Sequence, residues 1–118
     1  MTAIKSILVI DDNPINRILP GLILRPFGWV VYEAESGFDA FKRLREVKVC
    51  YILLDISMPN IDGLIVLDYL RKNPIDPVKI IAYTAYAAES DIANLLARGF
   101  DAVLLKPLTS KKLLSILK

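Results

Sequence analysis

Histidine is absent from all 118 residues, and cysteine occurs only once. The chain therefore lacks the commonest metal ligand and the commonest general base of proteins. Its single cysteine, Cys50, cannot close an internal disulfide, which favours a reducing, cytoplasmic environment. We expect Cys50 to be a buried strand residue rather than a nucleophile, because the chain holds no histidine to act as its base.

A strong net charge and long apolar runs are lacking as well. Fifteen Lys and Arg against thirteen Asp and Glu leave a formal charge of +2, too balanced to indicate direct binding of nucleic acid. No apolar run approaches the roughly 18–20 residues of a membrane span, and the first residues do not form a secretory signal. The chain does have 54% hydrophobic residues, enough to exclude disorder and to fill one core. We therefore expect a single domain over residues 1–118, with no membrane partner.

Short, nearly continuous apolar runs alternate along the chain with segments of helical spacing. The runs are typical of strands buried on both faces, at 7–10, 29–32, 49–54, 78–83 and 102–105. The other segments predict helices, within 15–27, 38–47, 64–70, 92–96 and 113–117. This alternation predicts an α/β fold with an open, doubly wound, five-stranded parallel sheet, flavodoxin-like order 2-1-3-4-5, and helices on both faces. Pro20, followed by Gly21, predicts a kink or an irregular turn in the first helix.

Polar side chains stand where four of the predicted strands end, and ligands of such sheets bind beyond the carboxyl ends of the strands. Asp11 and Asp12 follow the first strand, Asp55 ends the third, and Thr84 and Lys106 end the fourth and fifth. If the first and third strands are neighbours, the three carboxylates share one cleft, which is unfavourable unless a cation neutralises them. Oxygen ligands without histidine or cysteine indicate a hard ion, Mg²⁺ before Ca²⁺ or Zn²⁺.

A carboxylate beside a divalent ion, with an ammonium opposite, is placed to attack phosphorus. Lys106 offers a positive charge to an anion, and Thr84 offers a donor to a phosphoryl oxygen. Taken singly, each of these residues is more simply explained as a helix cap, a turn residue or a surface side chain. Their joint occurrence at four strand ends favours phosphoryl transfer onto a carboxylate.

These motifs resemble those of receiver domains of two-component response regulators, and the resemblance runs from Ile7 to Ile116. It is carried by four segments, 7–13, 53–59 with Asp62 and Gly63, 83–85, and 105–107. The run 11–17 is similar to receivers of hybrid sensor kinases and of single-domain phosphorelay regulators. The resemblance implies a phosphorylation-dependent signalling switch, not an enzyme with an external substrate.

The resemblance also implies a role for each candidate residue. Asp55 would be the phosphoacceptor, and Thr84 and Lys106 would hold the phosphoryl group. The implied protein ligands of Mg²⁺ are Asp11 (largely through water), Asp12, Asp55 and the backbone carbonyl of Ser57. The implied partners are a histidine kinase or histidine phosphotransfer protein and a downstream protein on the face of the fourth helix, fifth strand and fifth helix. Because the chain has no histidine, the phosphate comes from another protein or a small phosphodonor.

One position departs from the family pattern. Val103 stands three residues before Lys106, where the family commonly has an aromatic side chain that moves on activation. We expect the switch to use Tyr83 or Tyr86 instead, and we favour Tyr86, which would also shield the acyl phosphate from water.

Two alternative functions stay open at this point. One is a pseudo-receiver, a binding module that works without phosphate. The other is a phosphohydrolase of the haloacid dehalogenase type, which is disfavoured because neither Asp11 nor Asp55 begins the D-x-D motif of that family.

Overall fold

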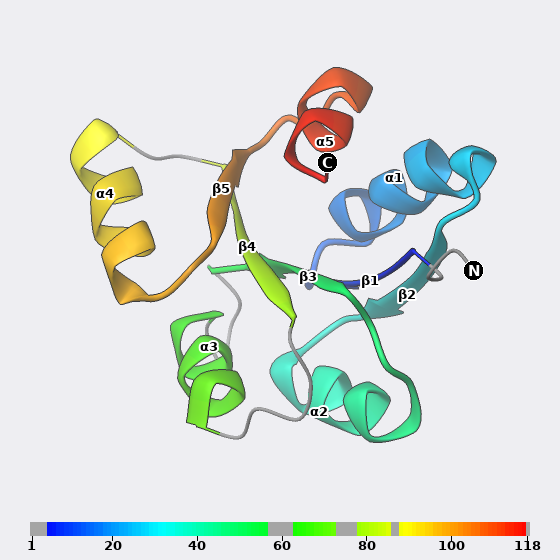
Figure 1. Ribbon diagram of the computed structural model, residues 1–118, viewed down its shortest axis with the longest axis horizontal. Helices are drawn as coiled ribbons and strands as arrows, with labels where there is room; N and C mark the ends of the chain where they lie inside the picture. The colour runs from blue at the N-terminus through cyan, green and yellow to red at the C-terminus, as the bar shows by residue number, and fades with distance from the viewer. Residues whose placement is uncertain (1–4, 57–62, 73–77, 86–87, 118) are drawn as a thin grey trace.

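The computed structural model describes residues 5–56, 63–72, 78–85 and 88–117, in which strands and helices alternate (Figure 1). The strands are β1 (Ser6–Ile10), β2 (Val30–Ala34), β3 (Tyr51–Asp55), β4 (Lys79–Thr84) and β5 (Ala102–Leu105). The helices are α1 (Pro14–Leu24), the 3₁₀ helix η1 (Arg25–Phe27), α2 (Gly37–Glu46), α3 (Gly63–Lys72), α4 (Glu89–Arg98) and α5 (Ser110–Ile116). Within these ranges, no helix has the combination of length and apolar character that crossing a membrane requires.

The five strands form one parallel sheet in the order β2-β1-β3-β4-β5, which confirms the predicted fold class and strand order. β1 and β3 are direct neighbours, and Ile10 pairs with Leu54 across them. The residues that follow this pair, Asp11 and Asp55, therefore reach the same edge of the sheet. The prediction that the carboxylates meet required the first and third strands to be neighbours, and the structure fulfils this condition.

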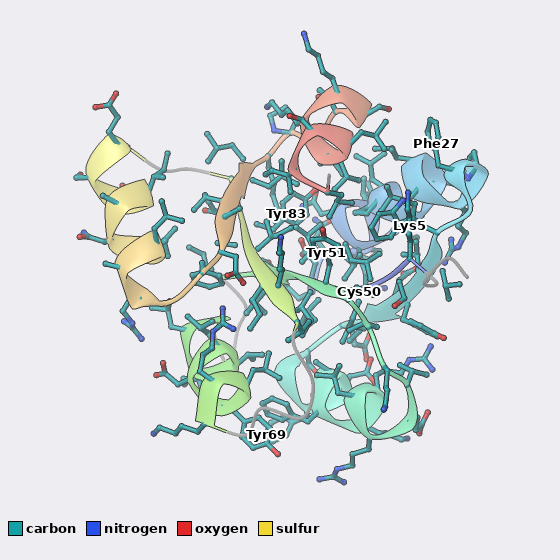
Figure 2. The ribbon with its side chains drawn as sticks, in the orientation of Figure 1. Lys5, Phe27, Cys50, Tyr51, Tyr69 and Tyr83 are labelled. Carbon is teal, nitrogen blue, oxygen red and sulfur yellow. The ribbon has the colours of Figure 1, made fainter. Side chains whose placement is uncertain are left out.

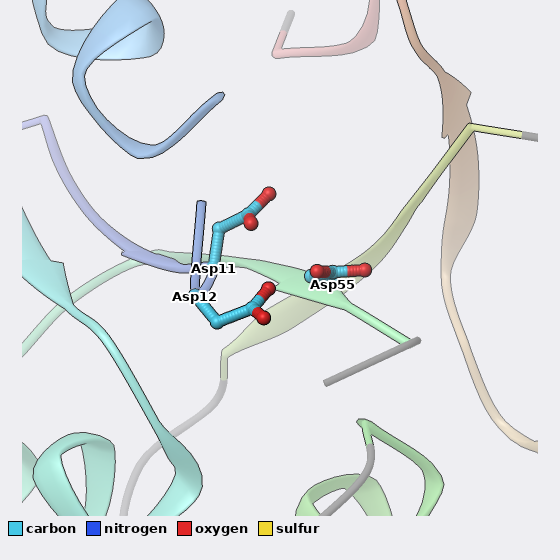
Figure 3. A group of neighbouring side chains, drawn as sticks. All are labelled: Asp11, Asp12 and Asp55. Atoms are coloured by element: carbon cyan, nitrogen blue, oxygen red, sulfur yellow. The ribbon is translucent and has the colours of Figure 1, made fainter. Parts of the chain in front are cut away.

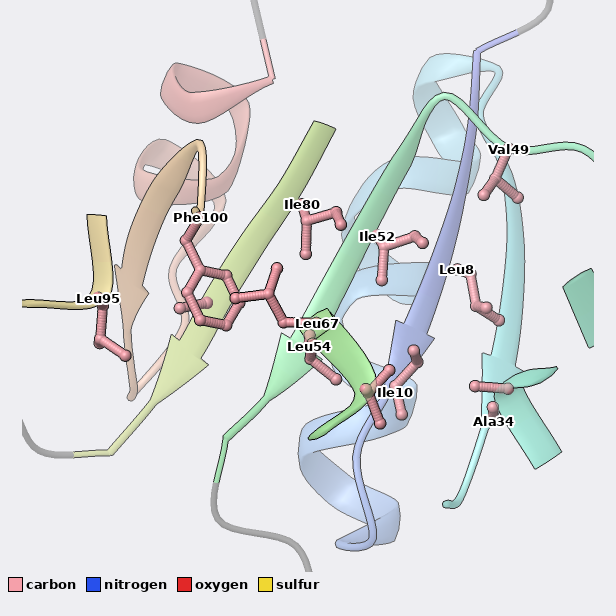
Figure 4. Close-up of a cluster of buried hydrophobic side chains, with 13 residues drawn as sticks. Leu8, Ile10, Ala34, Val49, Ile52, Leu54, Leu67, Ile80, Leu95 and Phe100 are labelled. Carbon is pink, nitrogen blue, oxygen red and sulfur yellow. The ribbon is translucent and has the colours of Figure 1, made fainter. Parts of the chain in front are cut away.

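Both faces of the sheet are buried, as the continuous apolar runs predicted. One face packs under α2, α3 and α4, where Leu8, Ile52 and Ile80 meet Leu67 and Leu95 (Figure 4). The other face packs under α1 and α5 (Figure 1). Its buried residues from the strands are Ile7, Val9, Val31, Leu53, Ile81, Tyr83 and Leu104. Alternate residues of each strand thus face opposite helical layers.

The first helix begins at a side-chain cap. The Asn13 side chain accepts hydrogen bonds from the N–H groups of Ile15 (3.0 Å) and Asn16 (3.1 Å), two donors that have no partner inside a helix. Of the kink or irregular turn predicted at Pro20, the irregular turn is wrong, because α1 continues through Pro20 to Leu24, and the kink stays a prediction. Pro20 is buried, and packing of a helix against the core can outweigh a missing backbone hydrogen bond.

The prediction that Cys50 is a buried strand residue is wrong. Cys50 is exposed and precedes the first residue of β3, Tyr51. The Ser6 hydroxyl donates to its Sγ at 3.7 Å. The apolar run that suggested a strand from Val49 extends two residues beyond the hydrogen-bonded strand, and element boundaries are less well determined by sequence than the elements themselves.

Candidate functional site

The polar residues at the strand ends lie at one edge of the sheet. Asp11, directly after β1, is fully buried, whereas Asp12 is exposed. Asp55 and Thr84, the last residues of β3 and β4, are each 4% exposed. Figure 3 shows Asp11 and Asp12, which follow β1, beside Asp55 at the end of β3. The structure therefore brings together the three predicted carboxylates.

The charges of this group do not balance among its members. Carboxylate oxygens of Asp11, Asp12 and Asp55 all lie within 4.8 Å of one another. The ammonium of Lys106 lies 2.9 Å from Asp11 Oδ2 and 3.7 Å from Asp55 Oδ2. Three carboxylates and one ammonium leave two negative charges in excess. One divalent cation would neutralise that excess. Its binding would be favourable because the three like charges repel one another at this distance.

The donor atoms also fit a hard divalent ion. Each of Asp11, Asp12 and Asp55 offers a carboxylate oxygen, the ligand atom that Mg²⁺ prefers. Asp11 Oδ2 is buried, and no residue in the described ranges donates an aligned hydrogen bond to it. The Lys106 ammonium approaches it closely but without hydrogen-bond alignment, so a lone pair of this oxygen stays open to a ligand. The three residues therefore form an acidic group suited to a metal.

Asp11 is held by the backbone around it and by Arg17, for which the sequence predicted no role. The Asn13 N–H donates to Asp11 Oδ1 at 2.9 Å, and the Asp11 N–H donates to the Ala34 carbonyl at 3.1 Å. Arg17 Nη1 donates to the Asp11 carbonyl at 3.1 Å, while Arg17 Nε pairs with Glu33 Oε1 at 3.3 Å. Arg17 thus ties the acidic pair to β2. Spacing along the chain could not reveal this role, because Glu33 reaches Arg17 only through the fold.

The backbone joins the ends of β4 and β5. The Lys106 N–H donates to the Thr84 carbonyl at 2.8 Å, which fixes the two predicted phosphate-binding residues relative to each other. The peptide bond between Lys106 and Pro107 is cis. The Lys106 side chain is 13% exposed. Its ammonium is therefore largely withdrawn from water and directed toward the carboxylates.

The start of α3 packs directly against the end of β3. A Cβ added at Gly63 would lie 2.5 Å from the Asp55 carbonyl oxygen and 2.6 Å from Ile56 Cα. Both neighbours are backbone atoms, so a side chain at position 63 cannot be accommodated by rotating another side chain. Gly63 therefore permits the close approach of α3 to the backbone of Asp55. Two other predicted residues of the site, Ser57 and Tyr86, lie outside the described residues.

Tyr83 is buried next to the site. Its side chain lies in the middle of the fold (Figure 2), with no exposed surface, and its Cα pairs with that of Asp55. The Lys106 Nζ lies 4.7 Å from the centre of the Tyr83 ring. Burial raises the pKa of Tyr83 to about 12, and the negative charges of Asp11 and Asp55 act in the same direction.

Val103, the residue that departs from the family pattern, lies on the other side of the sheet from Tyr83. It packs, half-buried, against the cluster under α2, α3 and α4, whereas Tyr83 belongs to the cluster under α1 and α5. Val103 and Tyr83 therefore occupy different spaces. Tyr83 belongs to one of the sequence motifs, the segment 83–85. Only the alternation of side chains between the two faces of the sheet shows which residues Tyr83 contacts.

The chain is similar in sequence and in structure to known receiver proteins. The sequence model of the response regulator receiver domain matches residues 7–118. The histidine-protein kinase BarA of Escherichia coli K12 is 31% identical over 113 residues, which are 95% of this chain but 12% of that protein. The response regulator DivK of Brucella ovis is 28% identical over 115 residues, 97% of this chain and 94% of that protein. A receiver protein of Pseudomonas putida superposes with a TM-score of 0.88 at 25% identity, covering 99% of this chain and 98% of that one.

The curated relatives thus differ in size. This chain spans only 13% of the sensor protein GacS of Pseudomonas syringae, and a similar share of BarA, but nearly all of DivK. The likeness to GacS and BarA therefore concerns one segment of a much longer protein.

Proposed function

The chain belongs to the response regulator receiver domain family, and from this premise we propose that it is a phosphorylation-dependent signalling switch that accepts a phosphoryl group on Asp55. We also propose that residues 1–118 are one receiver domain, because the family match runs from residue 7 to residue 118. The role is that of a signalling domain that promotes only its own phosphorylation and dephosphorylation.

One observation carries the proposal. Asp55 is nearly buried, it shares a pocket with the carboxylates of Asp11 and Asp12, and its Oδ2 lies 3.7 Å from the Lys106 ammonium. A carboxylate in this setting lies beside oxygens that could hold a divalent cation and beside the positive charge of Lys106. A cation held there and the ammonium are the two kinds of group that stabilise the negative charge of a phosphoryl group during transfer.

The proposed step is a displacement at phosphorus. An Asp55 carboxylate oxygen forms a bond to phosphorus, the bond from phosphorus to the donor atom breaks, and the donor keeps the electron pair. Lys106 pairs with the transferred phosphoryl oxygens, and the Thr84 hydroxyl donates a hydrogen bond to one of them. Asp11, Asp12, Asp55 and the Ser57 carbonyl would hold Mg²⁺, which supplies positive charge beside the phosphoryl oxygens.

The donor lies outside these 118 residues, because they contain no histidine to carry phosphate. We propose a phosphohistidine of a histidine kinase or phosphotransfer protein, in line with the family and with the names of the kinase BarA and the regulator DivK. The proposed surface for a downstream protein is the face of α4, β5 and α5; within α4, Leu96 is 45% exposed. The expected cytoplasmic location stays a prediction.

The two alternatives have different outcomes. The haloacid dehalogenase interpretation is wrong, since the chain belongs to the receiver family. A pseudo-receiver would have the same fold but would take no phosphate. The retained group of Asp11, Asp12, Asp55 and Lys106 supports a phosphorylated receiver over a pseudo-receiver.

Incubation with acetyl phosphate and Mg²⁺, followed by intact-mass measurement, tests the proposal. We expect one added phosphoryl group, which is lost in Asp55→Asn and suppressed by excess EDTA. Asp68→Asn is the matched control, because Asp68 is an exposed carboxylate of α3 that pairs with Arg98, and it should label like the wild type. Equal labelling of wild type and Asp55→Asn would refute the site, and no labelling of the wild type would favour a pseudo-receiver.

A further inference from the structure

Tyr83 is the largest fully buried side chain that touches the charged site. It contributes to the cluster under α1 and α5, and its Cα pairs with that of Asp55 in the neighbouring strand. Residues 55 and 83 lie on the same side of the sheet, because β3 and β4 are parallel and in register at this pair. The ring therefore lies beside Asp55 on the same side of the sheet.

Lys106 lies close to both the Tyr83 ring and the carboxylates. Its Nζ is 4.7 Å from the centre of the Tyr83 ring, 2.9 Å from Asp11 Oδ2 and 3.7 Å from Asp55 Oδ2. The face of an aromatic ring attracts a cation, and the attraction is strongest where water is excluded. With its side chain 13% exposed, Lys106 is in such a place.

The lysine needs such support because its side chain is long and flexible. An ammonium on four methylene groups has many rotamers, and a site for a transferring group requires one of them. The carboxylates attract the ammonium, but its contact with Asp11 Oδ2 lacks hydrogen-bond alignment. The ring gives the ammonium a further contact.

We propose that Tyr83 is a positioning residue, whose ring holds the Lys106 ammonium over the acidic pocket in the place where it meets the phosphoryl group on Asp55. The effect on phosphorylation rests on the proposed function, whereas the contact between the Tyr83 ring and the Lys106 ammonium does not. The ring carries the role, and the hydroxyl does not, because the close approach is to the ring centre. Tyr83→Phe keeps this contact, whereas Tyr83→Leu removes it and leaves a side chain that still fills part of the space.

Nuclear magnetic resonance tests the contact without any phosphate. Protons above an aromatic ring are shielded, so the ε-methylene protons of Lys106 should resonate upfield of those of Lys42, an exposed lysine of α2. We expect the upfield shift in wild type and Tyr83→Phe and its loss in Tyr83→Leu. A wild-type Lys106 resonance at the ordinary lysine position would overturn the proposal, even if Tyr83→Leu does not fold.

Phosphorylation kinetics with acetyl phosphate and Mg²⁺ test the consequence. Tyr83→Leu should slow labelling by about three- to thirtyfold, the range expected when a desolvated cation–π contact is lost. Tyr83→Phe should restore the rate, and in a Lys106→Ala background Tyr83→Leu should cause no further slowing. Equal slowing by Tyr83→Phe, or undiminished slowing in the Lys106→Ala background, would refute positioning by the ring. If the wild type takes no phosphate, the proposed function fails, while the Lys106 resonance still decides the contact.

Discussion

Replacing Gly63 by alanine tests the close approach between α3 and the strand that carries Asp55. The new Cβ would lie 2.5 Å from the Asp55 carbonyl oxygen and 2.6 Å from Ile56 Cα, against 3.4–4 Å for an ordinary contact. The helix or the strand end must therefore move by roughly 1 Å, and such overpacking costs about 1–3 kcal/mol. Alanine recovers about 0.5–1 kcal/mol through its lower unfolded-state entropy. The net expectation is a loss of about 1–2 kcal/mol, or roughly 3–10 °C in melting temperature.

Thermal denaturation followed by circular dichroism measures this loss, and Gly21→Ala is its matched control. A Cβ at Gly21 would lie 2.6 Å from Arg25 Nη1, the far end of a flexible side chain that can move aside. Gly21→Ala should therefore stay within about 1 kcal/mol of the wild type. Because the displaced backbone is that of Asp55, Gly63→Ala should also slow labelling by acetyl phosphate. A Gly63→Ala protein as stable as the wild type would refute the close approach.

Three further predictions follow from the contacts of the site. Millimolar Mg²⁺ should raise the melting temperature of the wild type, because it neutralises crowded carboxylates in the folded state alone, and Asp12→Ala should abolish the rise; an undiminished rise would place the metal elsewhere. Arg17→Ala should lower the free energy of unfolding by about 1–3 kcal/mol in urea denaturation, because it leaves the Asp11 carbonyl without its charged donor; an unchanged midpoint would contradict this. The pKa of Tyr83 is raised from 10.0 to about 12 in the folded state, so the unfolded state loses this proton first. The free energy of unfolding of the wild type, relative to that of Tyr83→Phe, should be constant below about pH 10 and should fall by about 2–3 kcal/mol as the pH rises through about 12. Parallel alkaline denaturation curves of the two proteins would refute this prediction.

The elements of the fold could be predicted because burial on both faces leaves a direct mark on the sequence. The apolar runs at Ile7–Ile10 and Ala102–Leu105 lie within β1 and β5 almost residue for residue. The run at 49–54 was less exact, since an apolar Val49 can be buried without joining the strand, and Cys50 was misplaced as a result. Proline propensity wrongly allowed an irregular turn at Pro20, because α1 continues through this buried residue.

The acidic group was predictable for a topological reason. Residues that end neighbouring parallel strands must share an edge, so Asp11 and Asp55 follow from strand order alone. The roles of Arg17 and Tyr83 were not predictable, because each depends on a partner that is distant in sequence. Glu33 meets Arg17 through the pairing of β1 with β2, and the Lys106 ammonium reaches the Tyr83 ring through the pairing of β4 with β5.

Chemical identification of the phosphorylated side chain tests the central claim most directly. Borohydride reduces an acyl phosphate of aspartate to the alcohol, homoserine, and peptide mass spectrometry then shows at which position the change has occurred. After treatment with acetyl phosphate and Mg²⁺, the account predicts reduction at Asp55 alone, with Asp11 and Asp12 unchanged. Reduction at Asp11 or Asp12, or labelled protein with no reduced aspartate, would contradict a receiver site built around Asp55.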